Sequence, residues 1–268
     1  MLSSASWRPL LAAAGTSLAA VDLVVAGKAG VAYALVRPPG HHAGPSCADG
    51  YCFFNHAALA AERFRAAGVE RLAIVDWDVH HGNGTQACFY ERADVLTISV
   101  HMRHGSWGPS HPETGGVAES GAGPGAGHNV NVELRLGSGD GAYAEVFHRV
   151  VEPLLERYRP QALIGACGQD ASTFDANGRM NVSMEGFHMI GESMRESAHR
   201  SGAPLVLVQE GGYARTYAAY CLHATLEGVL GAGRLLADPI AYLPDHPAHA
   251  SSDIDAVCRD HADRWGLR

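Results

Sequence analysis

The stretch LAIVDWDVHHGNGT, residues 72–85, joins an apolar run to a cluster of carboxylate and imidazole side chains. Its first four residues form an apolar run of strand length, and the Gly-Asn-Gly sequence at 82–84 breaks the chain. Side chains two apart in an extended segment point the same way, so Asp76, Asp78 and His80 share a face. These side chains predict a divalent metal site, with zinc favoured. The alternative, a solvated polar turn, would leave carboxylates beside a core without a partner.

Apolar runs of strand length alternate with segments of helical pattern along the whole chain. The strands are expected at 31–36, 72–76, 95–100, 130–134, 163–167 and 205–208, and the helices at 9–27, 57–67, 85–91, 141–158, 184–200, from the QEGGY motif to about 230, and 252–264. This alternation predicts a three-layer α/β/α fold with a mostly parallel sheet. Because no linker or change of composition divides the chain, we expect one domain over residues 1–268.

Composition narrows the range of partners and compartments. A net charge of -8 argues against nucleic acid as a direct ligand. Six cysteines without a CxxC pair form neither a disulfide framework nor a zinc ribbon, and we do not expect the nearby Cys47 and Cys52 to pair, so a reducing compartment, the cytoplasm, is predicted. Asp22 interrupts the apolar N-terminal segment, which we interpret as an amphipathic helix rather than a signal peptide or membrane span.

Five polar motifs each follow the carboxyl end of an expected strand. They are RPPGHHAG at 37–44, the Asp-X-Asp-X-His sequence at 76–80, the His- and Trp-containing loop at 101–116, GQDAS around Asp170, and QEGGY at 209–213. In open α/β sheets, ligands bind at this edge. The five motifs are therefore expected to converge on one crevice.

The residues in these motifs suit metal-assisted amide hydrolysis. Asp78, His80 and Asp170 would bind zinc and leave a fourth position for an activated water. His41 and His42 would act as base and acid. Their second ring nitrogens would be held by Asp76 and Asn83, and Tyr213 would donate a hydrogen bond to the oxyanion. Taken singly, adjacent loop histidines, a helix-capping aspartate and a packed tyrosine are ordinary features; their joint placement favours a catalytic site.

In this order, RPPGHHA, GYCFFN, DWDVHHGNGTQ, GQDAS..FD..GRM and QEGGY resemble the zinc-dependent histone deacetylase family. The similarity is greatest to bacterial class II deacetylases, which resemble acetylpolyamine amidohydrolases and acetoin-utilisation proteins. It covers about residues 7–230 and implies an arginase-like fold that removes acetyl groups from amines. The expected substrates are an acetylated lysine in a protein, or an acetylated polyamine or other small amine.

The resemblance also implies roles for particular residues. It assigns zinc to Asp78, His80 and Asp170, the general base to His42 of the His41–His42 pair, and the transition-state tyrosine to Tyr213. A monovalent cation, K⁺, would lie beside the zinc, and a substrate channel would lead to it. The cation would use Asp76, Asp78 and His80 with Ser99 and the Val100 carbonyl, and the channel would use Gly50, Tyr51, Trp107 and His111.

One departure from the family concerns the amino-terminal region, because only 36 residues precede RPPGHHA. Relatives usually have a longer segment there, so we expect an incomplete substrate rim, which a shortened chain or a partner would explain. An uncovered sheet edge would favour homo-oligomers. Two alternative functions stay open: an arginase-like binuclear manganese ureohydrolase, and a catalytically weak zinc-holding protein for binding or assembly.

Overall fold

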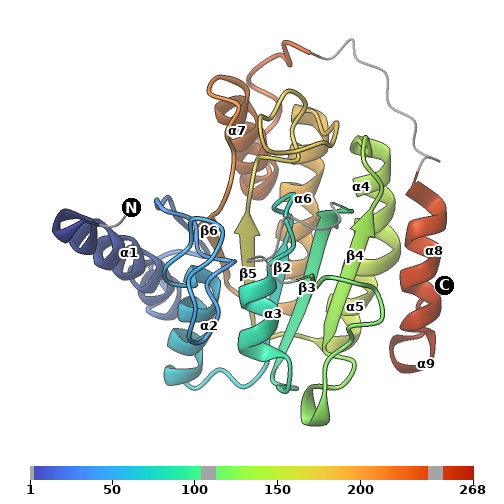
Figure 1. The fold of residues 1–268 in the computed structure, drawn as a ribbon, viewed down its shortest axis with the longest axis horizontal. Coiled ribbons are helices and arrows are strands. Elements are labelled where there is room, and N and C mark those ends of the chain that lie inside the picture. The colour runs from blue at the N-terminus through green and yellow to red at the C-terminus, as the bar shows by residue number, and fades with distance from the viewer. Residues whose placement is uncertain (1–2, 104–112, 241–249) are drawn as a thin grey trace.

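Six strands form a single parallel sheet in the computed structural model, which describes residues 3–103, 113–240 and 250–268 (Figure 1). The spatial order is β1-β6-β5-β2-β3-β4, and every neighbouring pair runs parallel. The strands are β1 (Val31–Ala34), β2 (Leu72–Asp76), β3 (Val95–Met102), β4 (Asn129–Leu134), β5 (Ala162–Cys167) and β6 (Leu205–Gln209). The predicted α/β class with a parallel sheet is confirmed.

Helices cover both faces of the sheet (Figure 1). They are α1 (Trp7–Val25), α2 (His56–Ala66), α3 (Asn83–Phe89), α4 (Asp140–Val146), the π-helical turn η3 (Phe147–Val151), α5 (Glu152–Tyr158), α6 (Met184–Ser201), α7 (Tyr217–Leu230), α8 (Ser251–Asp260) and α9 (Ala262–Trp265). Strand β2 is buried throughout, and its alternate side chains enter two cores. Leu72 and Ile74 pack on the side of α1 and α2, whereas Ala73 and Val75 pack on the side of α4 to α7. The sheet is therefore the middle of three layers.

Parallel strands place all their carboxyl ends on one edge of the sheet. Strand β5 lies between β2 and β6, and β6 lies between β5 and β1. The loops that follow these four strands are consequently neighbours in space, although they lie far apart in the sequence. This topology brings together the motifs that follow β1, β2, β5 and β6.

The two outer strands of the sheet have different surroundings. Helix α8 packs against β4, which is one edge (Figure 1). Within the described residues, β1 at the opposite edge pairs only with β6. The expected association of copies through this edge stays a prediction. Among the described helices, only α1 has the length and apolar composition of a membrane span, a test that core helices and signal sequences also meet; here α1 packs on α2 and β1.

Candidate metal centre and active site

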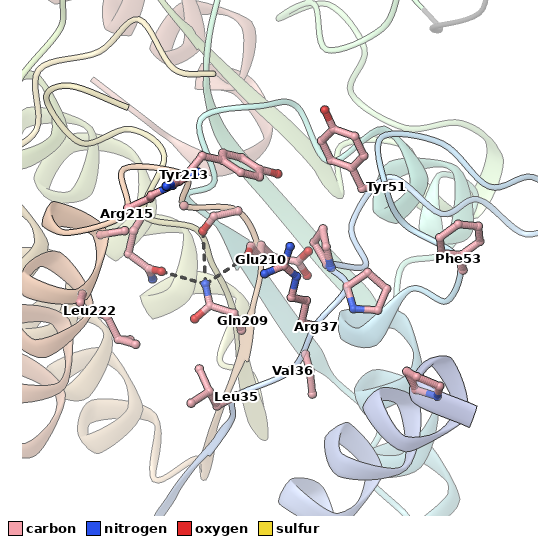
Figure 2. A pocket seen from close by; sticks show the side chains of 18 of the residues that line it. Leu35, Val36, Arg37, Tyr51, Phe53, Gln209, Glu210, Tyr213, Arg215 and Leu222 are labelled. Atoms are coloured by element: carbon pink, nitrogen blue, oxygen red, sulfur yellow. Dashed lines mark hydrogen bonds between the residues drawn. The ribbon is translucent and has the colours of Figure 1, made fainter. Parts of the chain in front are cut away.

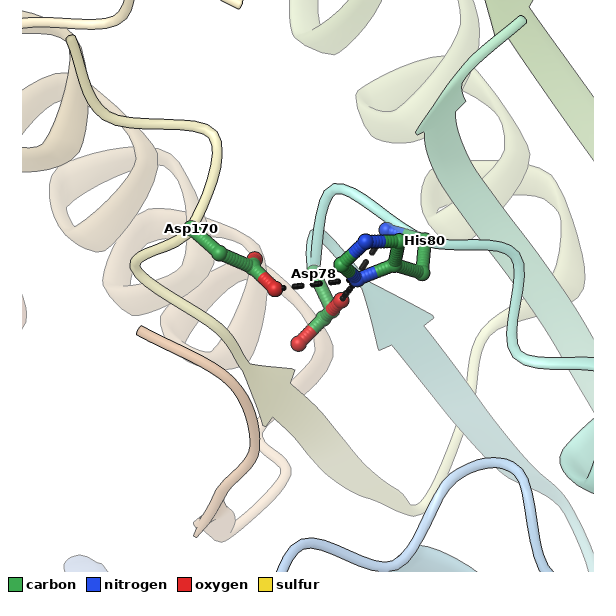
Figure 3. A group of neighbouring side chains, drawn as sticks. All are labelled: Asp78, His80 and Asp170. Carbon is green, nitrogen blue, oxygen red and sulfur yellow. Dashed lines mark hydrogen bonds and ion pairs between the residues drawn. The ribbon is translucent and has the colours of Figure 1, made fainter. Parts of the chain in front are cut away.

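Three side chains from two neighbouring strands meet at the carboxyl edge of the sheet and could hold a metal ion (Figure 3). Asp78 and His80 follow β2, and Asp170 follows β5. One ligand atom from each lies within 4.8 Å of the other two, and all three residues are buried. His80 Nδ1 lies 3.1 Å from Asp78 Oδ1 and 3.0 Å from Asp170 Oδ2. Two carboxylates and one imidazole form a donor set that zinc accepts.

Backbone N–H groups and close packing orient the two carboxylates. Asp78 Oδ2 accepts a hydrogen bond from the Gly211 N–H at 2.7 Å, and Asp170 Oδ1 accepts one from the Val79 N–H at 2.9 Å. A Cβ at Gly211 would overlap Asp170 Oδ2, so only glycine fits there. Asp170 Oδ2 is buried and accepts no hydrogen bond from a described residue, although His80 Nδ1 lies near it. This oxygen is therefore available as a metal ligand.

Without a cation, protons must balance the buried carboxylates. Burial and the charge on Asp78 raise the pKa of Asp170 to about 7. Burial acts to lower the pKa of His80, but the adjacent Asp170 and Asp78 outweigh it and raise that pKa to about 10. Metal ligands have to release such protons when they bind a cation. The donor set, its burial and its excess negative charge fit a divalent ion such as zinc.

Two adjacent histidines lie beside this metal group. His41 Nδ1 donates to Asp76 Oδ2 at 2.9 Å, and His42 Nδ1 donates to Asn83 Oδ1 at 2.6 Å. The structure thus places Asp76 and Asn83, the two partners expected for the histidine pair, against His41 and His42 respectively. His41 Nε2 lies 3.6 Å from Asp78 Oδ1, so its ring reaches the metal group itself.

Burial and charge move the pKa values of the two histidines in opposite directions. Burial acts to lower the pKa of His41, but the carboxylates of Asp78, Asp76 and Glu210 raise it well above its usual value. The pKa of His42 is well below its usual value because of burial and the neighbouring charge on His41. A pair whose pKa values diverge in this way can divide acid and base roles. Neutral His42 suits the base.

Glycines allow the loop that carries His41 and His42 to pack against the loop that follows β2. A Cβ at Gly82 would overlap the Asp76 carboxylate, and a Cβ at Gly84 would overlap the Ala43 backbone. Gly50 has a φ of 49° and lies against the His42 ring, where a side chain would also collide. The glycines of the Gly-Asn-Gly sequence therefore allow the two loops to approach closely, in addition to turning the chain.

Two tyrosines, Tyr213 and Tyr51, lie next to each other beside the site. The Tyr213 ring lies 6.2 Å from that of Tyr51, measured between centroids. Burial and the charges on Asp78 and Asp170 raise the pKa of Tyr213, so its hydroxyl keeps its proton. The other two expected channel residues, Trp107 and His111, lie outside the described residues. Of the expected cation ligands, Asp76 pairs with Ser99 in the sheet register, and Val100 follows in β3.

A pocket of about 1060 Å³ adjoins the site (Figure 2). Glu210 and Tyr213, on either side of the two glycines that follow β6, line it together with Tyr51. Leu35 and Leu222 contribute an apolar part of the wall (Figure 2). Pockets that bind small molecules have volumes of roughly 300–1,000 Å³. The space beside Tyr213 is thus large enough for a small organic ligand.

The structure adds two carboxylates to which sequence reasoning gave no role. Glu210 Oε2 accepts hydrogen bonds from the N–H groups of Gly40 and His41, at 2.6 and 3.0 Å. Asp175 Oδ2 accepts from the N–H groups of Tyr213 and Ala214, at 2.7 and 2.9 Å. Both residues lie inside the motifs QEGGY and GQDAS..FD, but neither has a spacing that predicts which backbone it contacts.

These features define a class: a parallel α/β protein with a single-metal candidate site, a hydrogen-bonded histidine pair and a nearby tyrosine. The sequence model of the histone deacetylase domain matches residues 1–229. Histone deacetylase 8 of Arabidopsis thaliana is 47% identical over 98% of this chain and 70% of its own length. The histone deacetylase-like amidohydrolase of Pseudomonas aeruginosa is 44% identical over 85% of this chain and 59% of its own length. The chain belongs to the histone deacetylase family.

Two further relatives widen this comparison. The acetylpolyamine amidohydrolase of Burkholderia pseudomallei is 42% identical over 78% of this chain and 58% of its own length. The crystal structure of the HDA15 HD domain superposes with a TM-score of 0.84 and 32% identity, covering 97% of this chain and 69% of that one. The chain therefore spans between 58% and 70% of the lengths of these relatives.

Proposed function

We propose that this chain is a zinc-dependent deacetylase that hydrolyses the amide of an acetylated lysine or an acetylated small amine. The observation that carries the proposal is the convergence of Asp78, His80 and Asp170 beside the His41–His42 pair. Membership of the histone deacetylase family supports it. Two relatives are named a histone deacetylase and an acetylpolyamine amidohydrolase, and both names indicate an acetylated amine as the substrate.

Each residue has a role that follows from its surroundings. Zinc bound by Asp78, His80 and Asp170 would activate a water molecule and polarise the amide carbonyl. Neutral His42, oriented by Asn83, accepts the proton of the attacking water, and the histidine pair returns a proton to the leaving amine. Tyr213 keeps its proton and donates a hydrogen bond to the developing oxyanion.

Two further expectations belong to this proposal. The cytoplasm is the proposed compartment. A monovalent cation such as K⁺ would bind beside the zinc through Asp76, Asp78 and His80, with Ser99 and the Val100 carbonyl. Flame emission on dialysed, zinc-loaded protein measures whether K⁺ is retained.

Acetate release tests the catalytic proposal directly. Zinc-loaded protein is incubated with an acetyl-lysine peptide and with an acetylated polyamine, with and without a chelator. We expect turnover that the chelator abolishes, and a loss of roughly 100-fold or more in His42→Ala and in Tyr213→Phe. His199→Ala, a change at an exposed histidine on α6, serves as the matched control and should keep wild-type activity.

The two alternatives give different results in the same assay. Retained zinc without turnover would favour a zinc-holding protein for binding or assembly. Two manganese ions per chain would favour an arginase-like ureohydrolase. Such a binuclear site needs more ligands than the single Asp78–His80–Asp170 group found among the described residues.

A further inference from the structure

The loops that follow β5 and β6 each carry one residue of the candidate site. The β5 loop supplies the metal ligand Asp170, and the β6 loop supplies Tyr213. Tyr213 follows Gly211 and Gly212, and Gly212 has a φ of 138°. Two glycines in succession leave the backbone with wide freedom. Gly211 is held by hydrogen bonds to Asp78 and from the Gln169 N–H, so the placement of the tyrosine depends on Gly212 and on contacts that lie beyond it.

One buried carboxylate, that of Asp175, joins these two loops. Its Oδ2 accepts hydrogen bonds from the N–H groups of Tyr213 and Ala214, at 2.7 and 2.9 Å. Its Oδ1 accepts hydrogen bonds within its own loop, from the N–H groups of Asn177 and Gly178, at 2.8 and 3.3 Å. The side chain is 8% exposed. Hydrogen bonds to a charged acceptor in a buried position are strong and directional.

The turn that carries Asp175 is packed directly on the metal ligand. A Cβ at Gly178 would overlap the Asp170 carbonyl oxygen, so the turn touches the Asp170 backbone without an intervening side chain. Phe174, just before the aspartate, has a φ of 67°, which a bulky residue rarely adopts. Its ring is 68% exposed, so burial of the phenylalanine does not account for this conformation. The residue after it, Asp175, points inward and contacts the N–H groups of Tyr213 and Ala214.

We propose that Asp175 is a positioning residue that sets the placement of Tyr213 relative to the Asp78–His80–Asp170 group. The expected effect on kcat rests on the proposed function, whereas the anchoring of the Tyr213 loop rests on the hydrogen bonds alone. Asparagine cannot replace the carboxylate, because its amide offers one acceptor oxygen and turns an N–H₂ group toward backbone N–H donors. Asp175→Asn therefore releases one of the two loops.

A double-mutant cycle on zinc-loaded protein tests whether Asp175 acts through Tyr213. We expect Asp175→Asn to lower kcat by about 10- to 100-fold with KM changed by less than about threefold. In a Tyr213→Phe background, the same change should cost less than about twofold, because the group being positioned is gone. Multiplicative losses in the double variant, or a fall in zinc content, would show a merely structural role and overturn the proposal.

Asp238→Asn is the matched control. Asp238 also accepts hydrogen bonds from two backbone N–H groups, those of Met184 and Ile240, but it contacts neither Tyr213 nor the metal ligands. This variant should keep wild-type kcat. If Asp175→Asn does not fold, Asp175→Glu keeps the charge and displaces the carboxylate by one methylene, and the same outcomes apply to it.

Amide hydrogen exchange gives a readout that does not depend on turnover. The N–H groups of Tyr213 and Ala214 should exchange at least about tenfold faster in Asp175→Asn than in wild type, and at the wild-type rate in Asp238→Asn. Unchanged exchange at both amides would overturn the proposal. If wild type releases no acetate from either substrate, the proposed function fails, while the exchange rates still decide whether Asp175 anchors the loop.

Discussion

The charge on single buried residues depends on which neighbours they face. Glu210 is 5% exposed, and burial raises its pKa to about 8, although the charge on His41 and the N–H of Gly40 act to lower it. Its Oε1 is buried and accepts no hydrogen bond from a described residue. In the metal-free protein at neutral pH, this carboxyl group therefore holds a proton more often than not.

This raised pKa predicts a pH dependence of stability. The pKa of Glu210 is higher in the folded than in the unfolded chain. The protonated side chain therefore contributes fully to the free energy of unfolding below about pH 4.5, and this contribution is lost as the pH rises to about 8. The slope is up to about 1.4 kcal/mol per pH unit. Glu210→Gln should remove this slope, so that the metal-free variant gains stability relative to wild type between pH 5.5 and pH 8.5. Urea unfolding at the two pH values measures it; an unchanged difference would contradict the assignment.

Residues that act through their own side chains could be predicted from the sequence, whereas residues that act on distant backbone could not. Asp78 and His80 could be predicted because Asp76, Asp78 and His80 stand at every second position, and two carboxylates and an imidazole on one face suit a metal. Glu210 and Asp175 bond to backbone N–H groups of other loops, about 170 and 38 positions away. Backbone N–H groups are present at nearly every residue, so no sequence pattern marks which of them a carboxylate will meet.

At the scale of elements, the main differences from the expected pattern come from hydrogen bonding. A single helix was predicted over 141–158, but the structure divides it into α4, η3 and α5. Pro153 has no N–H and cannot bond the carbonyl of Arg149, and the Glu152 N–H donates to the Phe147 carbonyl five residues back. Strand β3 continues to Met102, two residues beyond the prediction, because its pairing with β4 extends that far. Strand β1 ends at Ala34 rather than at Val36.

One carboxylate of helix α8 bonds two arginines at the outer edge of the sheet. Asp253 is 7% exposed and accepts hydrogen bonds from the backbone N–H and Nε of Arg135 and from Arg103. Burial acts to raise the pKa of Asp253, but Arg135 and Arg103 outweigh it and lower the pKa. The stabilisation is therefore present above the unfolded-state pKa of about 4 and is lost as pH falls through the lower folded value.

We predict that Asp253→Asn lowers the free energy of unfolding by about 1–2 kcal/mol at pH 7, because it removes charge-assisted hydrogen bonds. The corresponding fall in Tm is roughly 2–8 °C. The difference from wild type should shrink as pH falls below about 4, because protonation of Asp253 removes the charge that asparagine lacks. Asp260→Asn, at a more exposed position of the same helix, is the control and should change Tm little. Equal shifts in the two variants would exclude a special role for Asp253.

At the scale of the whole molecule, the sequence predicted the fold class but not the strand order. Alternating strands and helices indicate a parallel sheet with helices on both faces, and that is what forms. The chain order does not reveal that β6 inserts between β1 and β5, because this placement depends on packing between distant segments. The convergence of motifs at one edge could still be expected, since every parallel strand ends on that edge whatever the order.

The candidate metal site links the carboxyl ends of β2 and β5, which are neighbours in the sheet. Asp78 and His80 extend from β2, and Asp170 extends from β5, so a bound cation would bridge their ends. Unfolding separates these ligands and destroys the site. A cation that binds only the folded chain stabilises it by mass action. Because His80 and Asp170 hold protons at raised pKa values without metal, the cation competes with protons, and its affinity should increase with pH.

We therefore predict that zinc stabilises the folded protein as a whole. At about 100 times its dissociation constant, zinc should add about 2.7 kcal/mol to the free energy of unfolding, which raises Tm by roughly 5–10 °C. The gain at fixed zinc should be larger at pH 8 than at pH 6, and a chelator should reverse it. Scanning calorimetry of wild type, His80→Ala and the surface control His199→Ala provides the measurement. His199→Ala should respond to zinc like wild type, whereas an equal rise in Tm for His80→Ala would place the zinc elsewhere.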